Sequence, residues 1–328
     1  MGKQWQQILI AFILGLMLPG LAARLGGQVT GPMPQLQIPQ PETSEQATQP
    51  NTPEPYRIPV LTAEGDVISM ELDTYLVGVV LAEMPASFEA EALKAQAVVA
   101  RTYALKRVAE GLRHPQGAVC TDPGCCQAYI SPEDYQKSRG TLADVLKISL
   151  AVEATAGQIL TYNGELAEAT YFSCSGGRTE DAAAVWGTDI PYLQAVDSPG
   201  EEQAVPYRKT VRFTPAEFAR ALGRELTGHP RDWLGVVTYT EGGGVATMVV
   251  AGISYTGVRL RQLLGLNSTA FSMTVAEGCI FVSTLGKGHR VGMSQYGADA
   301  MAVGGSSFRQ ILNHYYPGTK IDKMDAIG

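Results

Sequence analysis

Glu83 is a carboxylate in an unusually apolar setting. The segment from Leu72 to Leu105 reads LDTYLVGVVLAEMPASFEAEALKAQAVVARTYAL, and aliphatic side chains flank Glu83 within it. A carboxyl group among apolar neighbours loses hydration, which disfavours its ionised form and raises its pKa. Such a group can donate a proton near neutral pH, so Glu83 is a candidate general acid. The alternative is an exposed glutamate in the last turn of a helix, because perturbed carboxylates mark functional sites only statistically.

Two helices are predicted around this residue. Asp73 is the expected N-cap of the first, and Pro85 should end that helix at or just before Glu83. The second helix is expected from about residue 89 to 109, with Gly111 at its C-cap. Glu83 would then sit at a helix end beside a turn, where its side chain can face a cleft.

The segment HPQGAVCTDPGCC follows the second helix and brings an imidazole close to three thiols. His114, Cys120, Cys125 and Cys126 match the ligand types of a tetrahedral structural zinc site. Adjacent Cys125 and Cys126 cannot easily turn both sulfurs to one metal. A disulfide from Cys120 to one of these two cysteines is the competing interpretation, and free thiols are the third.

The N-terminal part of the chain predicts a membrane attachment. One lysine, Lys3, precedes an apolar run from Ile8 to Ala23, which is near the lower limit of the ~17–25 residues that a span needs. Residues 1–26 are expected to be either a membrane anchor or a cleaved signal peptide. The positive residue before the run favours a single pass at the cell membrane, with the catalytic domain outside the cytoplasm. Residues 27–55, rich in Pro and Gln, are expected to be a disordered linker.

The remaining sequence predicts an α+β domain over residues 56–322, with catalytic helices packed on short mixed strands behind the N-terminal anchor helix. Thr214 should open a short helix, residues 235–257 alternate as a hairpin around a glycine-rich turn, and a last helix is expected over residues 306–315. The net charge is −7 and no basic run stands out, which argues against nucleic acid as a partner. Cys174 and Cys279 are either a disulfide or two buried thiols.

Three blocks of this sequence resemble the stage II sporulation protein D family. The first contains Tyr75-Leu76, Glu83-Met84-Pro85 and EALKAQAV, followed by ARTY. The second is YFSCSGGRT at residues 171–179, with VWG and PYL after it, and the third is GKGHRVGMSQYGA at residues 286–298. The resemblance implies a lytic transglycosylase of peptidoglycan. The same domain occurs in amidase-enhancer proteins of cell-wall turnover.

The resemblance implies that Glu83 is the catalytic acid. Lytic cleavage between N-acetylmuramic acid and N-acetylglucosamine uses no water: an acid protonates the glycosidic oxygen, and the muramic C6 hydroxyl closes a 1,6-anhydro ring. Hydrolysis instead needs a second carboxylate. A single acidic residue therefore fits the lytic reaction better, although Asp73 or Glu180 is a partner that folding could bring near.

Further site residues follow from the same resemblance. The side chains expected to bind glycan are those of Arg101, Tyr171, Ser173, Ser175, His289, Gln295 and Tyr296. Tyr171 and Trp186 are candidates for stacking on sugar rings, with core packing as the alternative. His289 is expected to pair with Glu83 or to orient the C6 hydroxyl. Arg290 stands where the family usually has Gly, which predicts an added charge beside the cleft.

The expected partners are peptidoglycan glycan strands, either intact or stripped of stem peptides, the membrane, and a cell-wall amidase. The expected role is glycan cleavage in the engulfment stage of sporulation or in wall remodelling. Some relatives bind zinc through a His and Cys loop, so structural zinc is the expected cofactor, with no organic cofactor. The alternative function is a noncatalytic glycan-binding module that recruits or stimulates an N-acetylmuramoyl-L-alanine amidase. A zinc hydrolase is a poor fit, because no HExxH spacing occurs.

Overall fold

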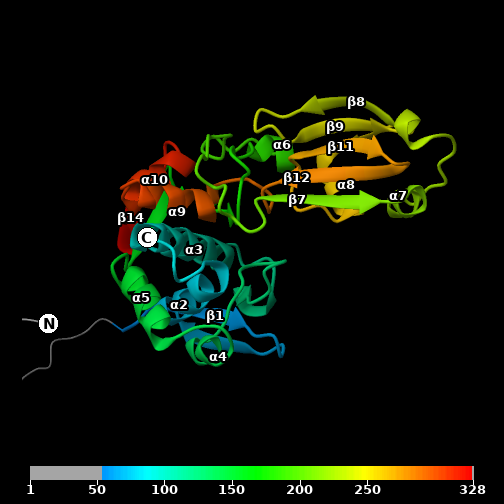
Figure 1. Ribbon diagram of the computed structural model, residues 1–328. Coiled ribbons are helices and arrows are strands. Elements are labelled where there is room, and N and C mark those ends of the chain that lie inside the picture. The colour runs from blue at the N-terminus through cyan, green and yellow to red at the C-terminus, as the bar shows by residue number, and fades with distance from the viewer. Residues whose placement is uncertain (1–53, 327–328) are drawn as a thin grey trace, which may run out of the picture. The chain divides into compact units, whose positions relative to one another are not determined.

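The part of the fold that carries Glu83 contains two helices and a small three-stranded sheet. The computed structural model describes residues 54–326 (Figure 1). Strand β2 pairs antiparallel with β1, and β3 pairs parallel with β1, so this sheet is mixed. The elements are β1 (Arg57–Leu61), β2 (Val67–Glu71), α2 (Leu72–Glu83), α3 (Ala90–Glu110) and β3 (Val119–Cys120).

The first hydrophobic core lies among α2, α3 and the elements that pack on them. Helix α3 contacts α2, α5, α9, α10 and β4, and its buried alanines let these neighbours approach closely. A short parallel pairing of β6 with β13 joins the second sequence block to the third. The further elements here are α4 (Pro132–Ser138), α5 (Leu142–Glu153), β4 (Gln158–Tyr162), β5 (Glu165–Leu166), β6 (Tyr171–Phe172), α6 (Ala182–Trp186), β13 (Met293–Ser294), α9 (Gln295–Val303), α10 (Phe308–Tyr315) and β14 (Lys320–Lys323).

A second hydrophobic core forms between residues 208 and 285. Strand β12 lies between β11 and β7, and β9 lies between β10 and β8 (Figure 1). Phe218, Trp233 and Leu260 are among the side chains buried between these sheets and their helices. The elements are β7 (Arg208–Phe213), α7 (Pro215–Leu222), β8 (Leu234–Tyr239), β9 (Val245–Val250), β10 (Ile253–Thr256), α8 (Gly257–Leu264), β11 (Phe271–Ala276) and β12 (Cys279–Leu285).

The predicted α+β class is confirmed within the described residues. Helix α2 ends at Glu83, because Met84 before the proline is extended, with φ −124° and ψ 143°. Helix α3 ends at Gly111 in the left-handed region, with φ 64°. Thr214 caps α7 with a reciprocal capping box, and the hairpin of β8 and β9 forms as expected.

One capping prediction is wrong. Asp73 is not the N-cap of α2, because that position is Glu71, whose side chain makes no cap hydrogen bond. Asp73 lies in the first helical turn and pairs instead with Arg101, at 3.2 Å. A carboxylate in the first turn is favourable for the helix dipole without being the cap, which is why the sequence pattern misled.

The predicted anchor over residues 1–26 and most of the predicted linker lie outside the described residues. Between residues 54 and 326, no helix combines the length and the apolar character that crossing a bilayer requires.

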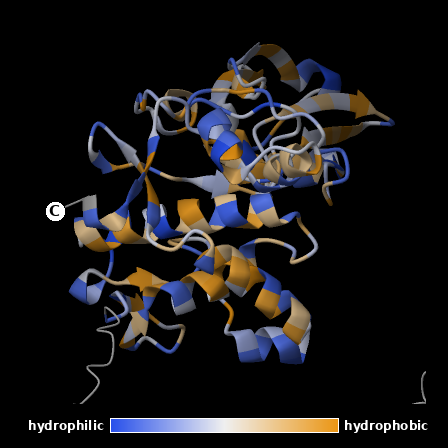
Figure 2. Cartoon of the chain, turned by 90° about the vertical axis from the view of Figure 1, so that its left-hand side faces the viewer, coloured by the Kyte–Doolittle hydropathy of each residue, from blue (hydrophilic) through white to orange (hydrophobic). Residues whose placement is uncertain are grey.

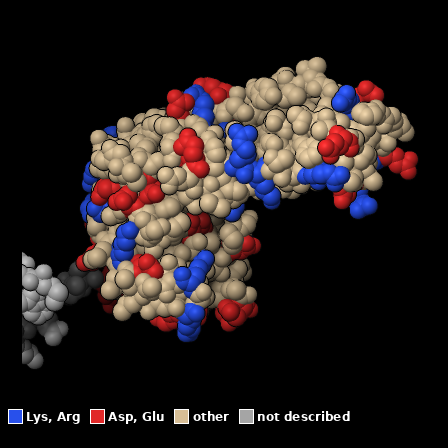
Figure 3. All heavy atoms as spheres, viewed as in Figure 1, with Lys and Arg blue, Asp and Glu red and all other residues tan. Residues whose placement is uncertain are grey.

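Surface and interior patterns agree with a folded domain of mixed charge. The helices in Figure 2 alternate between hydrophobic and hydrophilic stretches, as expected when one side of each helix packs on a core. On the face drawn in Figure 3, acidic and basic side chains are interspersed. That face has no broad patch of only positive or only negative charge.

Arg290 lies away from the cleft, which corrects the expectation of an added charge beside it. Its side chain is buried and pairs with the buried Glu180 at 3.1 Å. The guanidinium also donates to the backbone oxygens of Ser175, Arg178 and Gly242. Gly242 lies in the turn between β8 and β9, so this one side chain links the second sequence block to that hairpin.

Replacing Arg290 with methionine should destabilise the fold strongly. The change leaves the Glu180 carboxylate buried without its partner, which costs about 3–5 kcal/mol in comparable buried pairs. Urea unfolding measures the loss. Arg231→Met is the matched control, since Arg231 is exposed, and should change stability by less than about 0.5 kcal/mol. Equal effects of the two substitutions would contradict the assigned role of the Arg290 pair.

Candidate functional site

Glu83 lines a cleft of about 930 Å³. The end of α2, the chain around Cys125 to Ala128, strand β6 and the loop before β13 supply its lining. The three sequence blocks therefore meet at one place. Of the expected site residues, Tyr171, Ser173, His289 and Gln295 line this cleft together with Glu83.

Two hydrogen-bond donors hold the carboxyl group of Glu83. The backbone N–H of Ala128 donates to Oε1 at 2.8 Å, and the Gln295 amide lies 3.5 Å from Oε2. Tyr171 lines the same cleft. Burial raises the pKa of Glu83 above its ordinary value, and the hydrogen bonds from Ala128 and then Gln295 act against that rise. The net upward direction is the one that a general acid needs.

A second carboxylate in the cleft was missed from the sequence. Glu168 lines the cleft three residues before the second block and forms an ion pair with Arg107. Burial raises the pKa of Glu168, and Arg107 opposes that rise. The two carboxylates suggested by the sequence are elsewhere: Asp73 pairs with Arg101 and Glu180 pairs with Arg290. Glu168 stands between two alanines, and nothing in that sequence distinguishes it as a functional residue.

Basic side chains also line the cleft. Arg113 donates to the backbone oxygen of Cys125 at 2.7 Å, which ties the end of α3 to the cysteine loop. Lys287 is exposed and has no carboxylate partner among the ion pairs of the described residues. Trp186 is 42% exposed beside these groups, so it is available for stacking on a ligand.

Arg101, Ser175 and Tyr296, for which direct glycan binding was expected, are not among the residues that line the cleft. Arg101 is buried and donates to the backbone oxygens of Thr155 and Gln158. Tyr296 packs edge-on against Phe88, with ring centroids 4.9 Å apart. The sequence of a motif does not show which of its residues stabilise the fold and which face the ligand.

Ser175 is buried because the turn around it folds over the carboxylate of Glu201. Oε2 of Glu201 accepts hydrogen bonds from the Ser175 N–H and hydroxyl, the Gly176 N–H and the Cys174 thiol. Gly176 takes φ 81°, which favours glycine. The donors of this turn therefore bind a protein carboxylate.

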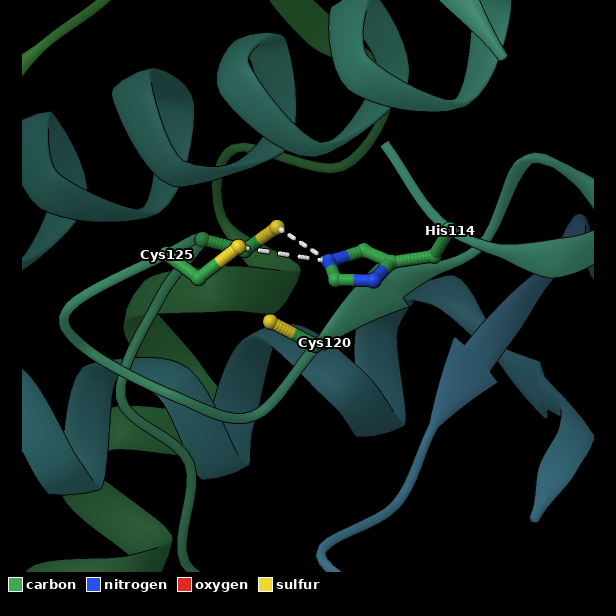
Figure 4. Close-up of side chains that lie close together, drawn as sticks. His114, Cys120 and Cys125 are labelled. Carbon is green, nitrogen blue, oxygen red and sulfur yellow. Dashed lines mark hydrogen bonds between the residues drawn. The ribbon is translucent and has the colours of Figure 1, made fainter. Parts of the chain in front are cut away.

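The His and Cys segment forms a cluster beside the cleft. In Figure 4 the imidazole of His114 points at the thiols of the loop. Its Nε2 lies 3.3 Å from Sγ of Cys125 and 3.6 Å from Sγ of Cys126. The four candidate ligand atoms, including the Cys120 sulfur, lie within 4.8 Å of one another. Sulfur and imidazole donors at this spacing fit a tetrahedral zinc ion, for which Zn–S is about 2.3 Å.

None of the cysteines forms a disulfide, and all of them lie among the described residues. Cys174 donates to Glu201 at 3.1 Å, while Cys279 accepts from Arg212 at 2.9 Å. Of the two interpretations of Cys174 and Cys279, the structure therefore has two buried thiols.

Several known proteins are similar to this chain in sequence. Residues 62–162 match the family model described as "Stage II sporulation protein". Stage II sporulation protein D of Bacillus subtilis is 42% identical over 278 residues, covering 83% of this chain and 80% of the relative. The chain belongs to the stage II sporulation protein D family. The Bacillus amyloliquefaciens protein of the same name is 41% identical over the same length.

A more distant relative of the stage II sporulation protein D family has a different name. The "Amidase enhancer" of Bacillus subtilis is 28% identical to this chain over 305 residues. The match covers 75% of this chain but 40% of that relative. The family resemblance inferred from the three blocks is thus confirmed. The relatives include both stage II sporulation protein D and an amidase enhancer.

His289 should remain neutral at the pH where Glu83 works. Burial, and then the charge of Arg261, lower the pKa of His289 from 6.5 to about 4. Its Nδ1 accepts from the Val291 N–H at 3.1 Å, so the neutral ring carries its proton on Nε2. A neutral His289 cannot form an ion pair with Glu83, but its Nε2–H can donate to a ligand.

Imidazole NMR titration of the protein should therefore show His289 protonating near pH 4. Because the fold favours the neutral ring, stability from this residue is present above about pH 6.5 and is lost as the pH falls towards 4. The His289→Asn variant identifies the resonance. A midpoint at or above the ordinary value of 6.5 would contradict the assignment.

Proposed function

We propose that this protein is a membrane-anchored lytic transglycosylase that cuts the glycan strands of peptidoglycan to 1,6-anhydromuramic products. The observation that carries the proposal is Glu83: a carboxyl group with a raised pKa, fixed by donors at the edge of a large cleft. The names of the relatives support a role in sporulation and in turnover of the cell wall. The apolar run from Ile8 to Ala23 supports attachment at the cell membrane with the domain outside the cytoplasm.

The proposed reaction uses Glu83 twice. Protonated Glu83 gives its proton to the glycosidic oxygen as the bond from that oxygen to the muramic anomeric carbon breaks. The C6 hydroxyl oxygen then bonds to the anomeric carbon, and its proton returns to the carboxylate of Glu83. The donors around Glu83 stabilise the carboxylate formed between the two steps. Ser173, Trp186 and His289 line the same cleft and are the side chains we assign to holding the sugars.

Glu168 favours hydrolysis as a second candidate reaction, because hydrolysis needs two carboxyl groups in one cleft. The charge of Arg107 opposes the rise in the pKa of Glu168 that burial causes, and a base needs that carboxyl group ionised. Mass spectrometry of the fragments separates the two reactions. Anhydro ends lack the mass of one water, whereas reducing ends would assign the water-activating role to Glu168.

The amidase-enhancer relative supports another alternative, a noncatalytic module that binds glycan and stimulates an amidase. Purified domain incubated with intact and stem-peptide-free peptidoglycan discriminates the two. Glycan binding without any cleavage of either substrate, together with faster cleavage by an added amidase, would favour the module.

Glu83→Gln should fold and bind glycan but release no anhydro product. The amide cannot donate the proton, and general acid catalysis of this kind contributes roughly 10²–10⁴-fold to rate. Glu64→Gln is the matched control, because Glu64 is exposed. Product is quantified by mass spectrometry and binding by sedimentation with glycan. Turnover by the Glu83→Gln protein at the wild-type rate would remove Glu83 as the acid.

We also propose that the His and Cys cluster holds a structural zinc ion. His114, Cys120, Cys125 and Cys126 would be the ligands, with the thiols as thiolates. The ion would cross-link the loop that carries Ala128, the first donor to Glu83. Zinc supplies only this cross-link, and the proton transfers stay with Glu83.

Metal analysis of purified protein should find about one zinc per chain, as a single four-ligand site requires. Cys120→Ser should lose most of the metal and lower the melting temperature, since structural zinc contributes directly to folding. Cys279→Ser, which changes a buried thiol outside the cluster, should keep the metal. A metal-free protein with an oxidised Cys120 would support the disulfide interpretation instead.

A further inference from the structure

Helix α5 is apolar on two opposite faces. The inner face packs in the first hydrophobic core. Its buried aliphatic side chains are Val145, Ile148 and Val152. The outer face carries Leu142, Leu146 and Leu150, which are 59%, 55% and 63% exposed. A helix that is apolar all round is normally buried on all sides. The outer face of α5, however, is left uncovered by the rest of the described chain.

The three outer leucines form one continuous line, which we call the leucine face (Leu142, Leu146 and Leu150). Residues four apart lie one above the other on a helix, so this line runs along most of α5. The two charged side chains within its span are engaged elsewhere. Asp144 closes the capping box at the start of α5, and Nζ of Lys147 donates to two backbone oxygens at 2.8 and 2.7 Å. Neither charge is available to interrupt the leucine face.

The described chain begins on the side of the molecule where α5 lies (Figure 1). The backbone oxygen of Tyr56 accepts from the Leu72 N–H at 2.8 Å, which places this part of the chain at the start of α2. There, Asp73 pairs with Arg101, and Arg101 also donates to the Val152 oxygen of α5 at 3.3 Å. Tyr56 is 54% exposed, and tyrosine is common where proteins meet the membrane–water interface. The chain thus enters the domain beside α5.

The sequence before this point is expected to keep the domain close to a bilayer. Residues 27–53 belong to the expected linker, and a flexible chain of that length has a root-mean-square reach of about 30 Å. The apolar run from Ile8 to Ala23 is the expected membrane anchor. Tethering at so short a distance gives a surface of the domain a high effective concentration at the bilayer, so even a weakly binding face can dock there.

A lipid surface suits the leucine face better than a second copy of the chain. A stable interface between proteins takes roughly 20–30 residues from each side. The leucine face offers three large apolar side chains on one helix, and the last residue of that helix, Glu153, is an exposed acid. A helix that lies on a bilayer buries its apolar side only about 5–10 Å deep, and its charged groups stay among the headgroups.

We propose that the leucine face docks on the surface of the bilayer to which the chain is anchored, with its three leucine side chains inserted among the lipid chains. None of the residues of α5 lines the cleft, so the docked domain can still receive glycan. The proposal rests on the membrane attachment within the proposed function, and it is independent of the reaction at Glu83.

Tryptophan fluorescence in vesicles of brominated phosphatidylcholine tests the docking. Full-length Leu146→Trp protein is reconstituted in these vesicles and in unbrominated ones, and the emission of the parent protein, which has three tryptophans, is subtracted. Bromine on the lipid chains quenches a tryptophan that reaches them. We expect the added tryptophan to lose most of its emission in the brominated vesicles, and to do so equally in high salt, because salt does not screen apolar contacts.

Two further variants separate the leucine face from the rest of the surface. Val236→Trp is the matched control: Val236 is 73% exposed on β8, and a tryptophan there should keep its emission. Combining Leu142→Ser and Leu150→Ser with Leu146→Trp should restore the emission, because two of the three inserting side chains are then polar. These leucines are more than half exposed, so the fold should be kept, and circular dichroism checks this.

Other occupants of the leucine face give different results. A blue-shifted emission of the Leu146→Trp protein without quenching would mean that protein covers the face, which overturns the proposal in favour of a second copy or another protein. Quenching that needs anionic lipid and disappears in high salt would mean that charges hold the domain at the membrane, which also overturns it. Emission that is neither shifted nor quenched would show an undocked face.

Flotation and product analysis keep this proposal apart from the proposed function. If the full chain floats with the vesicles but Leu146→Trp is not quenched, docking fails and membrane attachment stands. If the chain does not float, attachment and docking fail together. Quenching by a protein that forms no anhydro product would support the docking and remove only the proposed reaction.

Discussion

The site depends on a balance at one carboxyl group. Burial at the end of α2 disfavours the charge of Glu83, and donors from two distant parts of the chain, at Ala128 and Gln295, favour it. Neither effect alone suits acid catalysis. Burial without hydrogen bonds would keep the proton on Glu83, and full solvation would leave Glu83 deprotonated near neutral pH. The surrounding fold brings the end of α2, the loop after the cysteines and the start of α9 together at this carboxyl group.

Two other buried carboxylates serve the fold rather than the chemistry. Glu201 organises the turn after β6, with hydrogen bonds from Ser175, Gly176 and Cys174, and its second oxygen accepts from Ser198 at 2.6 Å. Glu180 joins Arg290 in a pair that also holds the turn between β8 and β9. Buried carboxylates are costly to leave without partners, so each of these two favours one arrangement of the loops around it.

Local sequence was enough to predict the elements but not every side chain's direction. Pro85 and Gly111 end their helices for reasons that act within a few residues, and Thr214 with its glutamate partner forms a cap by the same local logic. The meeting of Glu83 with Tyr171 and Gln295 could be expected from the family blocks. Whether a motif residue faces the cleft depends on distant partners: Ser175 turns inward because Glu201 lies 26 positions away in sequence, and no periodicity encodes that. Glu168 was missed for the same reason, since its partner Arg107 is 61 residues earlier.

The donor to Glu83 at Ala128 is a backbone N–H, and this has a consequence for how the site can vary over evolution. Almost any amino acid at position 128 keeps that donor, and proline alone removes it. Point substitutions there are therefore nearly silent towards the carboxyl group, whereas a one-residue insertion or deletion in the loop from Cys120 to Gln127 would displace it. Selection on this part of the site should act on loop length more than on side-chain identity.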